Sequence, residues 1–286
     1  MPIELSTLNI IFGIFVFLCG ISVGSFLNVV AYRIPLNISI VRPRSFCPNC
    51  KTQVPNYALI PIIGYFLTDA RCKHCNFKIP YHYPLVELIT GILTLIIFFK
   101  FISPIMVLEA LPKFMTIETF HYGKFHFNTF VPFFISLWIL YTGIPLSIID
   151  LNYRILPDKI TLPGTLIGFL ISCLNPNLGW QGSLIGILTG AGGLFIISKL
   201  YEIIRHRKGI GMGDIKYLGF IGAVLGWQGV IFTLFYASIL GSILGILWNI
   251  FAKKGFGSAI PFGPFLAFAA LAVSTYGNEL LNLIFK

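Results

Sequence analysis

Two aspartates stand where apolar segments of the chain meet polar ones. Asp150 ends an apolar run at Ile148-Ile149-Asp150, and Asp214 ends Gly211-Met212-Gly213-Asp214, which follows a basic stretch. A carboxylate near lipid costs about 2.5 to 3.5 kcal/mol at a helix centre, so an acid there is a candidate for function. Two acids at the ends of membrane helices indicate an aspartyl protease, in which one carboxylate activates water and the other donates a proton. Solvation of a helix end is the alternative interpretation.

Four of the six cysteines form a second group of residues whose types and spacing could do chemistry. Cys47 and Cys50 make one Cys-x-x-Cys pair, and Cys72 and Cys75 make another. Two such pairs complete a tetrahedral four-sulfur zinc site. The polar segment around them has few large apolar side chains, so metal binding would supply folding free energy that packing does not. An iron–sulfur cluster, a redox pair or disulfides are the alternatives, and a reducing cytosol argues against disulfides.

The elements that position these groups are membrane helices. Hydrophobic residues make up 56% of the chain and charged residues 10%, and the mean hydropathy is +0.87. Because a spanning helix needs about 20 apolar residues, the windows without Asp, Glu, Lys or Arg are candidate spans; they cover 5–32, 88–99, 125–149, 160–198, 217–252 and 255–278. Turn residues at 175–177 and 226–229 divide the two longest windows. The sequence predicts an all-α polytopic membrane protein of about eight transmembrane helices, with a small cytoplasmic four-cysteine zinc module between the first two.

The distribution of Lys and Arg predicts the orientation. With about eight helices, most of these residues fall in loops on one side, and cationic loops stay in the cytoplasm. Asp150, Asp214 and the zinc module are therefore expected on the cytoplasmic face. The net charge of +10 reflects topology, and no nucleic-acid partner is expected because the cations do not gather in one patch. The outer loop at 101–128 contains apolar residues that predict a short interfacial helix.

Six ordered motifs are similar to those of the prepilin peptidases, the bifunctional type IV prepilin leader peptidase and N-methyltransferase family. The similarity covers nearly the whole chain. The motifs are Gly24-Ser25-Phe26-Leu27-Asn28-Val29-Val30, the two cysteine pairs, Tyr83-Pro84-Leu85-Val86-Glu87-Leu88, Asp150 with Leu156-Pro157-Asp158, Gly211-Met212-Gly213-Asp214 and Pro261-Phe262-Gly263-Pro264.

The resemblance implies a GxGD aspartyl endopeptidase of the bacterial inner membrane that serves type IV pili and type II secretion. Such an enzyme removes the leader of type IV prepilins and type II pseudopilins, and then methylates the new terminal residue, commonly Phe, with S-adenosylmethionine as donor. Asp150 and Asp214 would be the catalytic pair. The implied domains are a first transmembrane helix at 1–32, a methyltransferase-associated zinc module at 33–84 and a transmembrane peptidase domain at 85–286.

Several nearby residues are candidates for supporting roles, each with a structural alternative. Gly211 and Gly213 would let a substrate backbone approach, or would serve close helix packing in a membrane. Asp158 would support the active site, or would cap a helix or form a surface ion pair. The motif beginning at Pro261 would border the active site, because broken helices at membrane depth line cavities or are buried in protein. Glu87 has no assigned role and is expected to pair with an arginine such as Arg33 or Arg71.

Two departures from the family pattern bear on methylation and on a cytoplasmic contact. The chain has Ala70 where the family commonly has glycine before the third cysteine, and His82 where relatives often have arginine. A peptidase without methyltransferase activity is therefore one alternative function. Others are a multi-pass transporter with a structural zinc domain and a presenilin-like protease. Because no glycine-rich nucleotide fingerprint occurs, the sequence does not locate the methyl-donor site.

Overall fold

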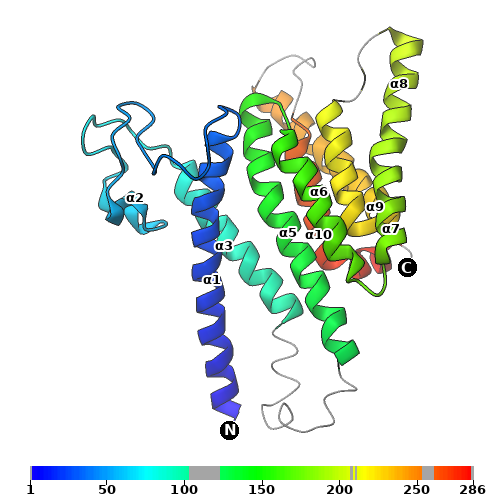
Figure 1. Cartoon of the computed structure of the whole chain (residues 1–286), viewed down its shortest axis with the longest axis horizontal. Coiled ribbons are helices and arrows are strands. Elements are labelled where there is room, and N and C mark those ends of the chain that lie inside the picture. Colours follow the sequence, from blue (N-terminus) through cyan, green and yellow to red (C-terminus); the bar gives the residue numbers. More distant parts are fainter. Residues whose placement is uncertain (1, 103–122, 207–208, 210, 253–260, 285–286) are drawn as a thin grey trace. The chain divides into compact units, whose positions relative to one another are not determined.

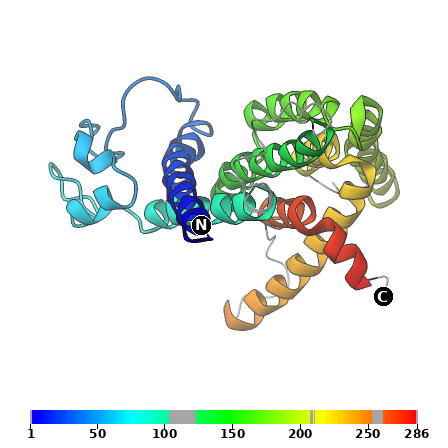
Figure 2. The same ribbon diagram turned by 90° about the horizontal axis from the view of Figure 1, so that it is seen from below.

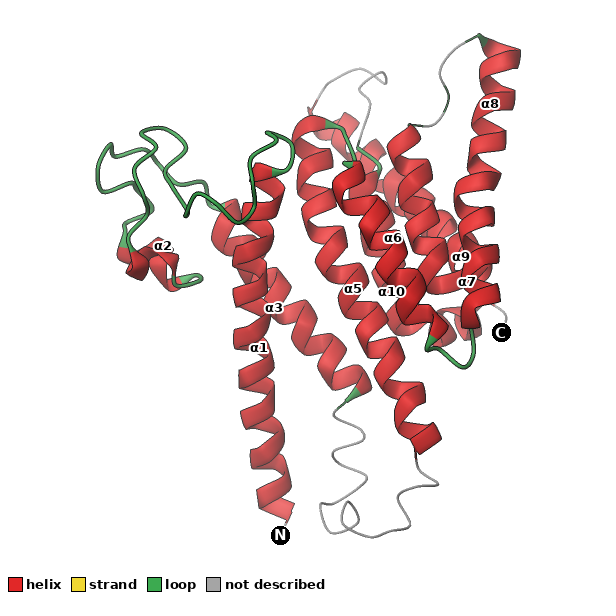
Figure 3. Ribbon diagram, viewed as in Figure 1, coloured by secondary structure: helices red, strands yellow, loops and turns green. Residues whose placement is uncertain are grey.

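The computed structural model describes residues 2–102, 123–206, 209, 211–252 and 261–284, which are mostly helical. Figure 3 shows helices and loops, and within the described ranges extended pairing is limited to two isolated bridges, Phe46 with Gln53 and Arg71 with Lys78. The chain divides into two compact units, Met1–Thr119 and Phe120–Lys286. The helix that follows the cysteine module therefore belongs to the same unit as the first helix.

The first unit is a helix pair that carries the cysteine module. Helix α1 (Pro2–Arg33) packs along α3 (His82–Phe101), as Figure 1 shows. Glycines allow this contact: a Cβ atom on Gly20 would lie 2.9 Å from the Cα of Gly91, and one on Gly24 would lie 2.9 Å from the Cα of Glu87. Small residues let membrane helices approach closely. The intervening module includes the short helices η1 (Asn56–Leu59) and α2 (Ile63–Leu67).

The second unit is a helical bundle with α9 at its centre. Its helices are α5 (Gly123–Tyr153), α6 (Asp158–Cys173), α7 (Gly179–Ile187), η4 (Leu188–Gly193), α8 (Leu194–Arg205), α9 (Met212–Ala252) and α10 (Gly263–Ile284). Helix α9 packs against α6, α7, η4 and α10, and α10 also packs against α5. Figure 1 shows that the C-terminal end of α5 and the starts of α6, α9 and α10 lie at one end of this bundle, and Figure 2 shows the same bundle from below. That end carries both aspartates.

Helix length and surface composition fit a multi-pass membrane protein. In the part of the chain that the structure describes, 5 helices are long and apolar enough to cross a bilayer: Asn9–Arg33, His82–Phe101, Phe130–Tyr153, Gly179–Arg205 and Met212–Leu247. Many large apolar side chains on these helices are exposed, including Ile11, Phe15 and Ile204, whereas Thr90, Ser136 and Ser183 are buried. Apolar residues outside and small polar residues between helices are typical of packing in lipid.

Both predicted turns coincide with interruptions of the helices. Helix α6 ends at Cys173, and the side chain of Asn175 accepts a 3.0 Å hydrogen bond from the backbone N–H of Asn177. Inside α9, Gly226 has φ 71° and ψ −177°, a conformation that glycine adopts without steric cost. Gly226 thus forms a kink that divides α9 into two helical segments. The interfacial helix expected within 101–128 lies largely outside the described residues.

Candidate active site and metal centre

Asp150 lies in the last turn of α5 with its carboxylate buried against the start of α10. The side chain is only 6% exposed, and its Oδ2 atom accepts a 2.8 Å hydrogen bond from the backbone N–H of Gly263. Gly263 is the first residue of α10. The first N–H groups of a helix have no partner within the helix, and the helix dipole favours a negative charge there. The start of α10 therefore fixes one aspartate by a charge-assisted hydrogen bond.

Gly263 has no room for a side chain. A Cβ atom there would lie 2.8 Å from Oδ2 of Asp150 and 3.1 Å from Cδ2 of Leu156. The contact requires glycine because the carboxylate lies directly against the backbone. This position belongs to the motif that the sequence placed at the border of the site.

Asp214 lies in the first turn of α9, half-buried. Its charge interacts with that of Asp150. A Cβ atom on Gly211 would lie 3.1 Å from Oδ2 of Asp214, and one on Gly213 would lie 3.0 Å from Cβ of Leu156. The two glycines thus let the aspartate fold back over the chain and let α9 approach Leu156, which also lies beside Gly263. The structure therefore brings Gly211, Gly213 and both aspartates into one region.

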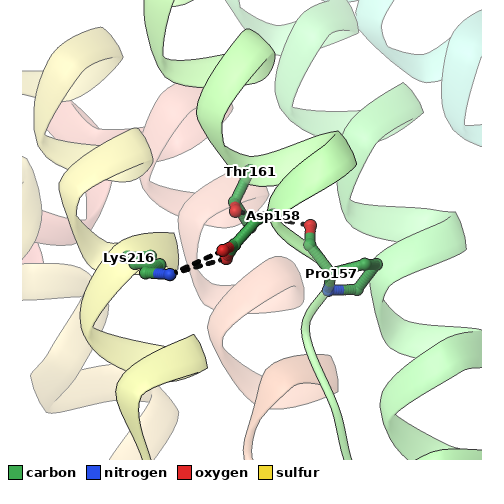
Figure 4. Close-up of polar contacts among 4 residues, drawn as sticks. All are labelled: Pro157, Asp158, Thr161 and Lys216. Carbon is green, nitrogen blue, oxygen red and sulfur yellow. Dashed lines mark hydrogen bonds and ion pairs between the residues drawn. The ribbon is translucent and has the colours of Figure 1, made fainter.

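Asp158 is the first residue of α6 and forms an ion pair with α9. Figure 4 shows the Lys216 ammonium group facing the carboxylate, at 2.8 Å from Oδ1 and 2.7 Å from Oδ2. Pro157, and not Asp158, occupies the N-cap position of α6. Lys216 follows Asp214 by two residues, so the pair links the start of α6 to the helical turn that carries the second aspartate.

The four cysteines form a compact tetrad in the first unit. The sulfur atoms of Cys47, Cys50, Cys72 and Cys75 all lie within 4.8 Å of one another. Two of the Sγ–Sγ distances, Cys47 to Cys75 and Cys50 to Cys72, are 3.8 Å. Four ligands at the usual Zn–S length of about 2.3 Å in a tetrahedron are about 3.8 Å apart. The donor set and its spacing therefore fit zinc.

The two cysteine pairs share one backbone geometry. The N–H of Cys47 donates to the carbonyl of Thr52, and that of Cys72 donates to the carbonyl of Phe77, both at 2.9 Å. The residue after each pair, Lys51 or Asn76, has a positive φ of 60° or 53°. The chain thus folds twice into the same knuckle, and each knuckle presents two sulfur atoms to one point.

Hydrogen bonds within the knuckles favour thiolates. The Thr52 hydroxyl lies 2.8 Å from Sγ of Cys50 and, with the Thr52 backbone N–H, lowers the pKa of Cys50 to about 6. Backbone N–H groups of Cys75 and His74 lower the pKa of Cys72, whereas burial raises the pKa of Cys47 to about 11. Since the thiolate is the metal ligand, part of the site is prepared for a cation at neutral pH.

Glu87 is bound by a backbone N–H group and not by the arginine that the sequence predicted. Glu87 is buried, and its Oε2 atom accepts a 2.6 Å hydrogen bond from the backbone N–H of Ile62, with a further bond from the Ser25 side chain. Arg33 instead donates to the carbonyl of Ser39 at 2.8 Å. A backbone donor replaces the expected arginine because the loop at Ile62 folds directly over the start of α3.

Sequence reasoning did not identify two contacts of the aspartate region. Leu156 lies between Gly213 and Gly263, and Lys216 pairs with Asp158. Leu156 belongs to the motif Leu156-Pro157-Asp158, but an apolar side chain does not indicate a role in an active site. Lys216 lies one helical turn from the first residue of α9, and only the fold reveals its partner.

Two family models match the chain, one in each compact unit. The Bacterial Peptidase A24 N-terminal domain matches residues 18–101, which include the cysteine tetrad. The Type IV leader peptidase family matches residues 133–246, which include Asp150, Asp158 and Asp214. Gly263 lies beyond the second match.

Similar curated proteins carry one name, Prepilin leader peptidase/N-methyltransferase. The protein of Pseudomonas putida is 27% identical over 91% of this chain and 89% of its own length. The protein of Stutzerimonas stutzeri is 27% identical over 98% and 96%. That of Myxococcus xanthus is 35% identical over 83% of this chain and 63% of its own length. No solved structure matches significantly.

Proposed function

Because the chain belongs to the type IV leader peptidase family, we propose that it cleaves prepilin leaders with Asp150 and Asp214 and methylates the new amino terminus. The observation that supports the peptidase assignment is the placement of two carboxylates at helix ends in one region of the second unit, where their charges interact and the N–H of Gly263 binds one of them. Two charged carboxylates whose charges interact repel each other, so we infer that the pair shares a proton and titrates as a unit.

The shared proton gives the pair both roles that peptide hydrolysis needs. The ionised aspartate takes a proton from water, which attacks the scissile carbonyl, while the protonated aspartate donates to the developing oxyanion. The hydrogen bond from Gly263 fixes the orientation of Asp150, and the first turn of α9 carries Asp214. Gly211 leaves room for the Asp214 carboxylate beside the backbone, and Gly213 lets α9 pack closely against Leu156. Asp158 supports the site through its ion pair with Lys216, which holds α6 to α9.

The substrates are type IV prepilins and type II pseudopilins, and the reaction occurs at the cytoplasmic face of the inner membrane. The distribution of Lys and Arg supports this orientation. A transporter is not favoured, because a proton relay requires carboxylates near the bilayer midplane, whereas both aspartates lie at the ends of helices.

The cysteine tetrad is the site of one zinc ion, held by Cys47, Cys50, Cys72 and Cys75. Bound zinc would hold the two knuckles together, and its binding free energy would stabilise a module with little apolar core. S-Adenosylmethionine supplies an electrophilic methyl group when it is bound, and the amino group exposed by cleavage accepts that group.

Mass spectrometry of the product tests the two activities separately. A membrane-embedded prepilin is incubated with the purified protein, with and without S-adenosylmethionine, and the mature amino terminus is analysed. We expect cleavage under both conditions and the added mass of one methyl group only with the donor. Cleavage without methylation would support a peptidase alone, and no cleavage would contradict the proposed function.

A further inference from the structure

A cavity of about 420 Å³ lies within the first compact unit, between the cysteine module, the end of α1 and the start of α3. Its size falls in the range of about 300 to 1,000 Å³ typical of small-molecule sites. Cys47 and Cys72 contribute to its wall, so the cavity adjoins the cysteine tetrad. The peptidase mechanism does not use it.

The cavity wall contains buried groups of opposite charge. Glu87 is 8% exposed, Arg33 is 4% exposed and the neutral Asn28 is 5% exposed. Each has a fixed position: Glu87 is bound by Ile62, Arg33 by Ser39, and the Asn28 side chain donates to the carbonyl of Tyr83 at 3.0 Å. A carboxylate and a guanidinium held in one wall can bind a ligand that carries both charges.

A strained turn shapes another side of this cavity. Ile62 has φ 61° and ψ −56°, and the N–H of Ile63 donates to the carbonyl of Pro61 at 2.6 Å. These features describe a γ-turn, which is rare and strained for a β-branched residue. The buried carboxylate of Glu87 holds the N–H of Ile62 and thus keeps this turn in place. Strain of this kind occurs at ligand sites, where surrounding contacts maintain it.

Aromatic rings complete the wall. Phe46 lines the cavity, and the guanidinium of Arg33 lies 5.5 Å from its ring centre. Four tyrosines also line the cavity, namely Tyr32, Tyr57, Tyr65 and Tyr83. Aromatic faces stack on flat heterocycles and attract cations, including those without a hydrogen to donate.

We propose that this cavity binds S-adenosylmethionine. The inference rests on the methyltransferase activity proposed above and assigns it a location. The donor combines an adenine ring, a sulfonium cation and a zwitterionic amino acid, and the wall offers aromatic rings for the first two and opposite charges for the third. During transfer the neutral amine of the cleaved substrate forms a C–N bond, the electron pair of the broken C–S bond remains on sulfur, and the excess proton leaves the nitrogen for water.

Calorimetric titration of the purified full-length protein with S-adenosylhomocysteine, the unreactive product, measures binding without turnover. Ala58 lines the cavity, so Ala58→Trp fills it. Glu87→Gln removes the buried charge and weakens support of the turn. We expect each variant to raise the Kd at least about tenfold, equivalent to about 1.4 kcal/mol. Zinc content and prepilin cleavage should be retained, which verifies folding.

Two control variants test whether binding of S-adenosylhomocysteine depends on the cavity and not on the peptidase site. Val41 is 78% exposed and does not line the cavity, so Val41→Trp adds the same bulk without an effect on the Kd. Asp214→Asn, which removes a member of the peptidase pair, should also bind normally. Equal binding by wild type and Ala58→Trp would overturn the proposed location of the binding site, but it would not contradict the proposed methyltransferase activity. Failure of the wild type to bind S-adenosylhomocysteine would also overturn the inference. If the prepilin incubated with S-adenosylmethionine also carried no methyl group, the proposed methyltransferase activity would be contradicted as well.

Discussion

The backbone N–H of Gly263 donates a 2.8 Å hydrogen bond to Oδ2 of Asp150. A Cβ atom at position 263 would lie 2.8 Å from that same oxygen. Gly263→Ala should therefore displace the carboxylate and weaken a charge-assisted bond that contributes about 1.5 to 3 kcal/mol. We expect prepilin cleavage to slow by about ten- to a hundredfold, measured with a purified membrane-embedded substrate.

Gly277→Ala on the same helix is the matched control, because the nearest atom to a Cβ atom there is Cγ1 of Val273 at 4.0 Å. Its cleavage rate should equal that of the wild type. Equal rates for Gly263→Ala and the wild type would mean that this contact does not position the Asp150 carboxylate for cleavage.

Residue types and hydropathy predicted much of this site, but not its contacts. Asp150, Asp214 and the four cysteines carry their own chemical signal, and apolar windows place both aspartates near helix ends. The bond between Asp150 and Gly263 joins residues 113 positions apart and uses a backbone donor, which nearly every residue possesses. The same reason explains Glu87, whose partner is the N–H of Ile62 and not an arginine.

The ion pair between Asp158 and Lys216 should contribute modestly to activity. An exposed pair contributes about 0.2 to 1 kcal/mol, so Asp158→Asn and Lys216→Met should each slow cleavage by no more than about fivefold. Because both remove the same link, the double variant should be no slower than either single one. Disruption of the exposed Lys199–Glu202 pair on α8 should have no effect. A loss for Asp158→Asn as great as for the catalytic pair would assign Asp158 a direct chemical role.

Removal of the Thr52 hydroxyl should make zinc retention more sensitive to acid. The hydroxyl is the largest of several contributions, the backbone N–H of Thr52 among them, that lower the pKa of Cys50 to about 6, so Cys50 stays a thiolate until the pH falls towards that value. In Thr52→Val the pKa rises, protonation competes with metal binding at higher pH, and zinc should leave at higher pH. Released zinc measured from pH 8 to pH 5 with a colorimetric indicator checks the shift. Thr189→Val, in the other unit, should follow the wild-type curve, and a Thr52→Val curve identical to it would contradict the expectation.

Ala70 has φ 54°, which lies in the left-handed region that favours glycine. A residue with a Cβ atom loses roughly 1 kcal/mol in this region. Because metal binding and folding of the module are coupled, Ala70→Gly should tighten the apparent zinc affinity by up to about fivefold, measured by competition with a chelator. Asn76→Gly, at φ 53°, should change it less, since asparagine tolerates this conformation. Weaker zinc binding by Ala70→Gly would show that the methyl group makes a contact that outweighs the strain.

Cleavage of a membrane-embedded prepilin by wild type, Asp150→Asn and Asp214→Asn tests the account most directly. General acid–base catalysis contributes about 10² to 10⁴-fold to a rate, so each substitution should slow cleavage by at least about a hundredfold. Zinc content and S-adenosylhomocysteine binding should remain unchanged. Cleavage at the wild-type rate by either variant would contradict the assignment of these two aspartates as the catalytic pair.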